Sequence, residues 1–226
     1  MKTSLIFLVL LLPFAIDAQD YLASPEFNKF WRDVEQSHFI EGKEEANYSG
    51  TPYLFESNFS SILLQDGHII DSLTIRYNVY NDRMEIKKGE NFYAIPKEKL
   101  FPHIVLEDRH FYLKIFKETS KRQIGYFESI VNDSLCSLYL RHNVFLQEAS
   151  EPKPFQDAKP ATFKSKPADL FITFDAEVLL LIKNKNDFLD ITPDHQKELA
   201  AFIKTNKIKF KKPESVKLLV EYYNAL

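Results

Sequence analysis

The stretch Leu73–Ile95, LTIRYNVYNDRMEIKKGENFYAI, decides the expected fold. Its first arm alternates apolar and polar side chains with a period of two, which is typical of a strand with one buried face. The apolar set consists of Leu73, Ile75, Tyr77 and Val79. Asn81-Asp82 and then Gly89 favour the left-handed backbone of tight hairpin turns. The stretch therefore predicts a β-meander.

The same pattern continues on both sides of this stretch. Turn signals stand at residues 66–67, 107–108 and 132–133, each between two short apolar runs. Links of this length join antiparallel strands and exclude parallel crossovers between neighbours. Residues 59–149 are therefore predicted to form an antiparallel meander sheet, either flat or rolled toward a barrel or cup.

The N-terminus has the pattern of a secretory signal peptide. Lys2 precedes the apolar run Leu5–Leu12, and small residues follow near position 18. The run is less than half of the roughly 20 residues that a membrane-spanning helix needs. We expect cleavage between Ala18 and Gln19, which makes residues 1–18 a signal peptide and leaves no transmembrane span in the mature chain.

Three further regions complete the predicted organisation. Residues 19–58 form an N-terminal segment with one expected helix, because Phe27, Phe30, Trp31 and Val34 share a helical face. Residues 150–167 contain four prolines, too many for a central strand, and predict a linker or an extended surface segment. Residues 168–226 predict a β-hairpin followed by helices that pack on the same sheet, one of them starting at Thr192-Pro193-Asp194. The expected fold class is α+β, mainly β.

Composition limits the classes of function. The net charge of −3 gives no support to binding of nucleic acid or of an anionic membrane surface. The 20 Phe and 11 Tyr against five Gly favour strands over glycine-rich phosphate loops. The single cysteine, Cys136, cannot form an intrachain disulfide and is expected to be a small buried side chain. The protein must therefore be held together by its core.

No motif in the sequence indicates catalysis, a cofactor or a metal. The sequence contains no HxH, HExxH, CxxC or GxSxG pattern. His103 and His110 are expected to be cross-strand neighbours, but a solvated turn is favoured there over a metal site. The lysines at positions 204, 207, 209, 211 and 212 favour a solvated loop over a surface for nucleic acid or lipid head groups.

Two sets of residues are candidates for binding or modification. Arg76, Asn78 and Tyr80 share the polar face of the opening strand and would line a binding surface if the sheet curls. An exposed strand face with cross-strand pairs is the favoured alternative. Ser72 and Ser134 stand in Asp-Ser-Leu tripeptides, which resemble the acceptor for O-glycosylation of exported proteins in Bacteroidota.

Six blocks of sequence, in this order, resemble an uncharacterised family of exported Bacteroidota proteins. The blocks are GTPYL (Gly50–Leu54), RYNVYNDRMEI (Arg76–Ile86), FYAI (Phe92–Ile95), GYFE (Gly125–Glu128), PKPFQDAKPATF (Pro152–Phe163) and the ending KLLVEYYNAL. The resemblance implies a periplasmic, outer-membrane-associated or secreted location in a Gram-negative bacterium. It implies no activity and brings no catalytic residues.

The leading hypothesis is a non-catalytic exported cell-envelope protein that binds an envelope protein partner or helps to assemble a surface structure. The alternative is a carrier of a lipid or other small molecule in an aromatic-lined β cup. A hydrolase whose site cannot be recognised from spacing is a third class. A closed, hollow barrel would favour the carrier, whereas a flat or filled sheet would favour the partner-binding hypothesis.

Overall fold

The computed structural model describes residues 25–36, 39–40, 48–54, 60–63, 67, 69–97, 103–117, 121–151, 158–174 and 177–226. The predicted signal peptide and its cleavage site at Ala18 and Gln19 lie outside these residues. The described residues confirm the predicted fold class, because antiparallel strands dominate and helices follow them at the C-terminus. The helices are α1 (Pro25–Gln36), α2 (Lys185–Ile191), α3 (Gln196–Thr205) and α4 (Pro213–Asn224).

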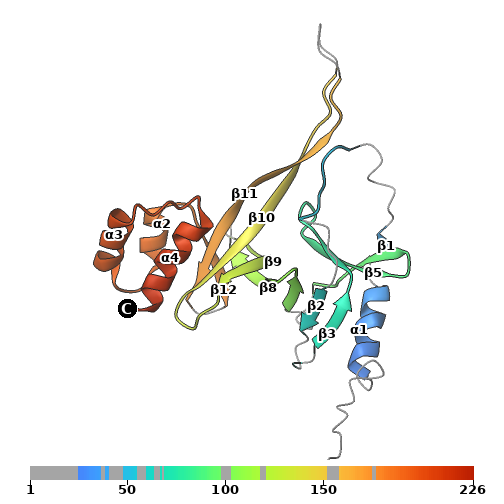
Figure 1. The fold of residues 1–226 in the computed structure, drawn as a ribbon, viewed down its shortest axis with the longest axis horizontal. Helices are drawn as coiled ribbons and strands as arrows, with labels where there is room; N and C mark the ends of the chain where they lie inside the picture. Colours follow the sequence, from blue (N-terminus) through green and yellow to red (C-terminus); the bar gives the residue numbers. More distant parts are fainter. Residues whose placement is uncertain are drawn as a thin grey trace, which may run out of the picture.

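The strands belong to two sheets (Figure 1). The small sheet has the order β1 (Phe39–Ile40), β6 (Asn91–Ala94), β5 (Arg83–Lys88) and β4 (Ile75–Asn78). The large sheet has the order β12 (Val178–Ile182), β11 (Thr162–Thr173), β10 (Ser137–Gln147), β9 (Arg122–Val131), β8 (Arg109–Lys117), β7 (His103–Leu106), β2 (Ser60–Leu63) and β3 (Ile69–Leu73). The predicted meander of residues 59–149 is therefore not one sheet, because β4–β6 form a separate unit between β3 and β7.

The division between the sheets falls inside the stretch that predicted the meander. Ser72, the last residue but one of β3, has a left-handed φ of 59° at an irregularity in the β2–β3 register, where the chain turns toward β4. Leu73 pairs with Ser60 in the large sheet, whereas Ile75 pairs with Ile86 in the small one. The alternation of apolar residues continues across the turn, so it gave no sign of a boundary.

Strand β12 closes part of the large sheet into a ring. It pairs antiparallel with β11 and parallel with β8, so that β8–β12 form a closed five-stranded ring. A parallel pair was not expected from the short links between neighbouring strands. It arises because β12 reaches β8 only after β9, β10 and β11 have curled round.

Large side chains fill the interior of the ring. Each of the five strands contributes one residue to a cluster inside the ring, and every residue of this cluster is at most 2% exposed: Phe116, Phe127, Tyr139, Phe171 and Leu179. The three phenylalanine rings contact one another edge to face, with centroid separations of 5.0, 5.3 and 5.8 Å. The sheet is therefore rolled, as one of the two alternatives proposed, and its interior is occupied by side chains.

Strands β10 and β11 extend beyond the ring as a two-stranded arm (Figure 1). We define the arm as residues 141–147 of β10 together with residues 162–167 of β11. The sequence predicted a linker or extended surface segment over residues 150–167, and the structure differs in that β11 already begins at Thr162. Proline is tolerated because Pro167 lies at an irregularity in the β10–β11 register and on a strand edge.

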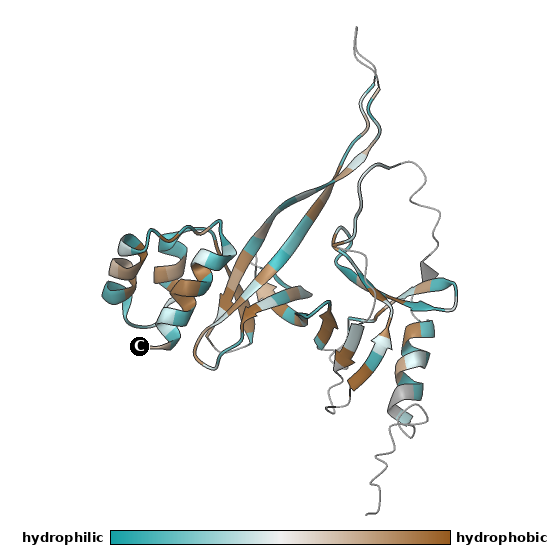
Figure 2. Ribbon diagram, in the orientation of Figure 1, coloured by the Kyte–Doolittle hydropathy of each residue, from teal (hydrophilic) through white to brown (hydrophobic). Residues whose placement is uncertain are grey.

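Apolar helix faces cover both ends of the molecule (Figure 2). In α1, Phe30 and Val34 join an apolar core that the small sheet shares with strands β2, β3 and β7–β9 of the large sheet. Helices α2–α4 pack on the outside of the ring, where the buried side chains are Leu138, Leu140, Leu170, Ile172, Ile182, Phe188, Leu199, Val216, Leu219 and Val220. The C-terminal helices therefore lie on strands β9–β12 of the large sheet.

The helix start predicted at Thr192 is displaced. Thr192 is the C-cap of α2, and its hydroxyl donates to the carbonyl of Phe188 at 2.6 Å. Helix α3 begins at Gln196 after His195, which has a φ of 53°. Helix α2 was not predicted, although Asn184 accepts hydrogen bonds from the backbone of Asn186 and Asp187 as an N-cap does.

Candidate functional site

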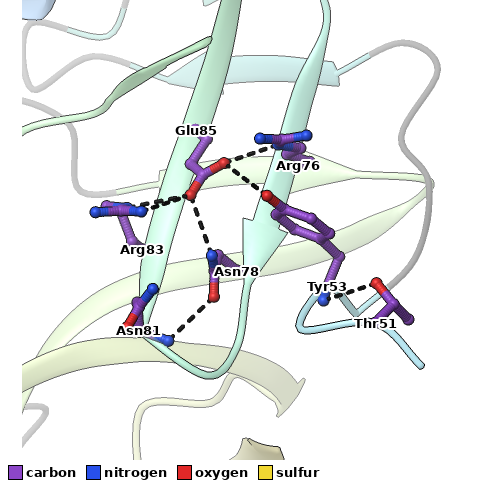
Figure 3. Close-up of polar contacts among 7 residues, drawn as sticks. All are labelled: Thr51, Tyr53, Arg76, Asn78, Asn81, Arg83 and Glu85. Carbon is purple, nitrogen blue, oxygen red and sulfur yellow. Dashed lines mark hydrogen bonds and ion pairs between the residues drawn. The ribbon is translucent and has the colours of Figure 1, made fainter. Parts of the chain in front are cut away.

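The three predicted binding residues do not form one surface. Arg76 and Asn78 lie on β4, and the structure brings both of them to the carboxylate of Glu85 on the neighbouring strand β5 (Figure 3). Tyr80 lies beyond the end of β4 and is 46% exposed. Its ring contacts Phe163 of the arm at a centroid distance of 5.3 Å. Arg76 and Asn78 therefore share one face of β4, as predicted, whereas Tyr80 does not.

Glu85 is fully buried and accepts hydrogen bonds from four side chains, a group that we call the Glu85 cluster. Arg76 donates through Nε to Oε2 at 2.7 Å, and Tyr53 donates its hydroxyl to the same oxygen at 3.4 Å. Arg83 and Asn78 donate to Oε1, at 3.1 and 3.3 Å (Figure 3). A buried carboxylate needs such donors to offset its lost hydration.

Strand register and two aromatic rings assemble the Glu85 cluster. Arg76 stands directly opposite Glu85 in the β4–β5 pair. The Arg76 guanidinium lies 4.2 Å from the ring centroid of Tyr53 and 3.7 Å from that of Phe92. Because cation–π stacking and the carboxylate both hold this side chain, it is poorly placed to bind a separate ligand. The geometry is that of a structural ion-pair network.

Sequence reasoning missed Tyr53, Arg83 and Glu85. The turn signal indicated the wrong register: a two-residue turn at Asn81-Asp82 would place Asn78 opposite Glu85, whereas the connection spans residues 79–82 and places Arg76 there. Opposite charges at directly paired positions attract across a hairpin. The sequence around Glu85 did not indicate that its carboxylate is buried. Tyr53 belongs to a distant segment, which is held beside β4 by the hydrogen bond from Leu54 N to the carbonyl of Tyr77, at 3.0 Å.

Asp82 joins the small sheet to the ring. Its Oδ1 accepts from the Tyr77 hydroxyl at 2.8 Å and from the backbone N–H of Tyr126 at 3.2 Å, and its Oδ2 accepts from Lys97 at 2.6 Å. Burial raises the pKa of Tyr77 well above its usual value, and the nearby Asp82 charge raises this pKa further. A Cβ at Gly125 would lie 2.9 Å from Asp82 Oδ2, so a side chain at this position would displace the Asp82 carboxylate.

The expected pairing of His103 with His110 is present. His103 Nε2 and His110 Nδ1 lie 2.8 Å apart, and the His103 ring stacks on Tyr112 at a centroid distance of 4.3 Å. Burial, with the neighbouring His110, lowers the pKa of His103. Within the described ranges, no group of three or more His, Cys, Asp or Glu residues is arranged to hold a metal ion. The two histidines form a hydrogen-bonded pair.

A second polar pair lies where the arm leaves the sheet. His142 Nε2 is 2.6 Å from Glu128 Oε2, and Arg109 lies 3.4 Å from the same oxygen. Glu128 pairs with Leu140, the last residue of β10 that pairs with β9. The contact therefore connects β8, β9 and β10 at the base of the arm and orients the arm relative to the ring.

The two predicted acceptors for O-glycosylation are accessible. Ser72 is exposed and borders a shallow pocket together with Asp71, Glu107 and Asp108. Ser134 is exposed in the connection between β9 and β10. Exposure is a requirement for modification, and modification of these serines stays a prediction.

Comparisons with known proteins found no matching family model, no similar curated protein and no similar solved structure. Among the residues that the structure describes, no helix is long and apolar enough to cross a membrane. Function must therefore be argued from the arrangement of this chain alone.

On the outer edge of β11, the segment around Ser49 is already hydrogen-bonded to the strand. Ser49 accepts from the backbone N–H of Phe163 at 2.8 Å, and its own N–H donates to the carbonyl of Ala161 at 2.9 Å. Phe163 therefore turns its backbone groups away from β10. In an antiparallel pair, the N–H and C=O groups of the two residues point either toward each other or away from each other. Leu146, the cross-strand partner of Phe163, therefore points its backbone groups away from β11, toward the outer edge of β10.

Strand β10 consequently has a free edge along the arm. Two residues before Leu146, Val144 repeats the outward orientation and pairs with Ser165 of β11. Beyond Leu140, no strand in the described part of the chain pairs with β10 on its outer side. The backbone groups of Val144 and Leu146 therefore face outward along this edge.

The two edges of the arm differ in their protection. Lys164, Lys166 and Pro167 occupy β11, and such residues are typical of edges that resist pairing with another strand. Residues 142–147 of β10, HNVFLQ, include no lysine and no proline. The edge of β10 is thus the better candidate for a strand-binding surface, and sequence reasoning missed it because the arm's second strand was interpreted as a linker.

Proposed function

We propose that this chain is a non-catalytic exported cell-envelope protein that binds an extended segment of a protein partner. The segment would add as a strand to the outer edge of β10, between residues 142 and 147. The observation that carries the proposal is the unequal protection of the two arm edges. Strand addition uses main-chain hydrogen bonds for affinity and side-chain contacts for specificity.

The ring interior supports partner binding over the carrier hypothesis. A carrier that used the rolled sheet as a cup would need a hollow interior. Phe116, Phe127 and Phe171 instead contact one another inside the ring. Its aromatic residues therefore serve packing.

The polar clusters give no support to the hydrolase hypothesis. Glu85 accepts from Arg76, Arg83, Asn78 and Tyr53, so its lone pairs are engaged by donors of its own fold. A general base needs a lone pair directed at a substrate. Export to the periplasm, outer membrane or medium is inferred from the signal-peptide pattern, together with the resemblance to exported Bacteroidota proteins.

Two proline variants of one cross-strand pair test the edge; Val144 packs against the apolar core and Ser165 is exposed, so their thermal unfolding is compared as well. Val144 and Ser165 are cross-strand partners, and neither donates its N–H to the ladder between β10 and β11. Val144→Pro would therefore remove an outward N–H from the β10 edge, and Ser165→Pro would remove one from the β11 edge. Each mature full-length variant would be purified from the envelope of the native host, with a photo-crosslinker at Leu146 in a parallel sample.

We expect a stoichiometric partner that crosslinks at Leu146, persists with Ser165→Pro and is lost with Val144→Pro. Equal thermal unfolding of the two variants would show that the arm tolerates both changes. Recovery of the protein without a partner, or equal retention of the partner by both variants, would contradict the proposal.

A further inference from the structure

The turn between α3 and α4 concentrates positive charge at the end of the molecule that carries the C-terminal helices. Five exposed lysines and no carboxylate stand between residues 204 and 212, and we call this segment the lysine turn. Its lysines are Lys204, Lys207, Lys209, Lys211 and Lys212. The whole chain has a net charge of −3, so the lysine turn opposes the sign of the remainder.

The lysines have few counter-ions within the protein. Lys212 lies 3.9 Å from Glu214, and within the described residues none of the other four forms an ion pair. Lys29, by comparison, lies 2.7 Å from Asp33 on its own helix. Like charges placed together without partners repel one another, and a bound anion would relieve that repulsion.

The backbone of the lysine turn is fixed by hydrogen bonds. Lys207 has a φ of 51°, and the next N–H, of Ile208, donates to the carbonyl of Ile203 at 3.1 Å, which closes α3. The N–H of Lys209 donates to the Ser215 hydroxyl at 3.0 Å. The backbone that carries the five lysines is therefore held in one conformation by these hydrogen bonds.

Apolar residues alternate with the lysines and direct them outward. Ile208 and Phe210 pack against the core between the helices and the ring, and the Phe210 ring lies 6.3 Å from that of Phe188. Lys207, Lys209 and Lys211 occupy the alternate, exposed positions. In the lysine turn, the lysine side chains therefore face the solvent, while the apolar side chains pack against the core.

An exposed apolar side chain lies close in sequence to the lysine turn. Leu218 is 56% exposed in the second turn of α4, which begins directly after Lys212, and its neighbours on the same helix face are the exposed carboxylates of Glu214 and Glu221. Basic residues combined with an exposed apolar side chain are typical of surfaces that lie on anionic lipid, where lysines meet phosphates and the apolar group enters the interface. A soluble polyanion would use the lysines alone.

We propose that the lysine turn docks the protein on the anionic phosphate head groups of a membrane surface, with Leu218 entering the interface. The proposal concerns a different surface from the arm and does not depend on a protein partner. Attraction between lysines and an anionic surface weakens as salt is added. Binding should therefore be reversible by salt.

Vesicle co-sedimentation of the mature full chain tests this docking. The probes are vesicles of phosphatidylglycerol mixed with phosphatidylcholine, and vesicles of phosphatidylcholine alone. One variant combines Lys204→Gln, Lys207→Gln, Lys209→Gln and Lys211→Gln. The matched control combines Lys117→Gln, Lys121→Gln, Lys159→Gln and Lys164→Gln, which removes the same charge from four exposed positions elsewhere.

We expect the wild-type chain and the control to bind the anionic vesicles at low salt and to leave them at high salt. Each neutralised lysine of the turn should weaken binding about fivefold. Leu218→Ser should also weaken it while keeping the dependence on salt. Equal losses in the two lysine variants, unchanged binding by Leu218→Ser, equal binding to neutral vesicles, or no binding by the wild-type chain would overturn the proposal.

Discussion

The small sheet and the five-stranded ring are stabilised in different ways. In the small sheet, the fully buried Glu85 meets Arg76 and Arg83. In the ring, Phe116, Phe127 and Phe171 pack against one another, and the Arg141 guanidinium lies over the Phe116 ring, 4.4 Å from its centroid. Buried apolar area favours folding directly, whereas a buried ion pair must first overcome the cost of removing its charges from water.

This difference suggests a division of roles. The ring interior supplies net stability, because aromatic side chains bury large areas and lose little by leaving water. We infer that the Glu85 cluster contributes mainly to the correct pairing of β4 with β5 and to the docking of Tyr53, since a shifted register would leave the carboxylate without its donors. Three sets of substitutions test the comparison.

The largest effect is expected inside the ring. Phe127→Ala removes a fully buried ring that contacts both Phe116 and Phe171, and should lower the free energy of unfolding by about 3–5 kcal/mol. Ile124→Ala, on the same strand at an exposed position, should cost less than about 1 kcal/mol. Urea denaturation of both variants gives the measurement. Similar losses in the two would contradict the role given to the ring interior.

A smaller effect is expected in the Glu85 cluster. Glu85→Ala leaves two arginines without their carboxylate, and we expect a loss of about 2–3 kcal/mol because these arginines are partly hydrated. The double variant Glu85→Leu with Arg76→Met should recover part of this loss, since an apolar pair has no unpaired charge. Glu90→Ala, in the exposed turn after β5, is the control. Denaturation midpoints of these variants decide whether the cluster acts through stability or through pairing.

The local pattern predicted burial well wherever one strand face determines it. Ile75, Tyr77 and Val79 are buried as the alternation predicted, because a period of two reflects one face turned to the core. The same alternation placed Asn78 on the wetter face, yet Asn78 is buried. This face of β4 is covered by Tyr53, which is distant in the sequence. The alternation within a single strand carries no information about such a contact.

The closure of the ring could not be predicted for a related reason. Val178 of β12 pairs with Ile115 of β8, and nothing in either strand's own sequence specifies the other as its partner. The turn signals specified only neighbours along the chain. Likewise, the composition of residues 150–167 indicated prolines but not that Pro167 lies on an edge where its missing N–H has no cost.

The smallest effect is expected at the junction between the two regions, where Gly125 of the ring meets Asp82 of the small sheet. Gly125→Ala would bring a Cβ to 2.9 Å from Asp82 Oδ2, and should cost about 1–2 kcal/mol as Asp82 shifts from Lys97. In an Asp82→Ala background the contact with Asp82 is removed and only the contacts with Phe116 and Phe127, at 3.3 and 3.5 Å, remain, so the same glycine substitution should cost less. Residues in contact give such non-additive effects in a double-mutant cycle, whereas independent sites do not. Additive losses would mean that this contact does not couple the two sheets, and that the apolar core they share joins them instead.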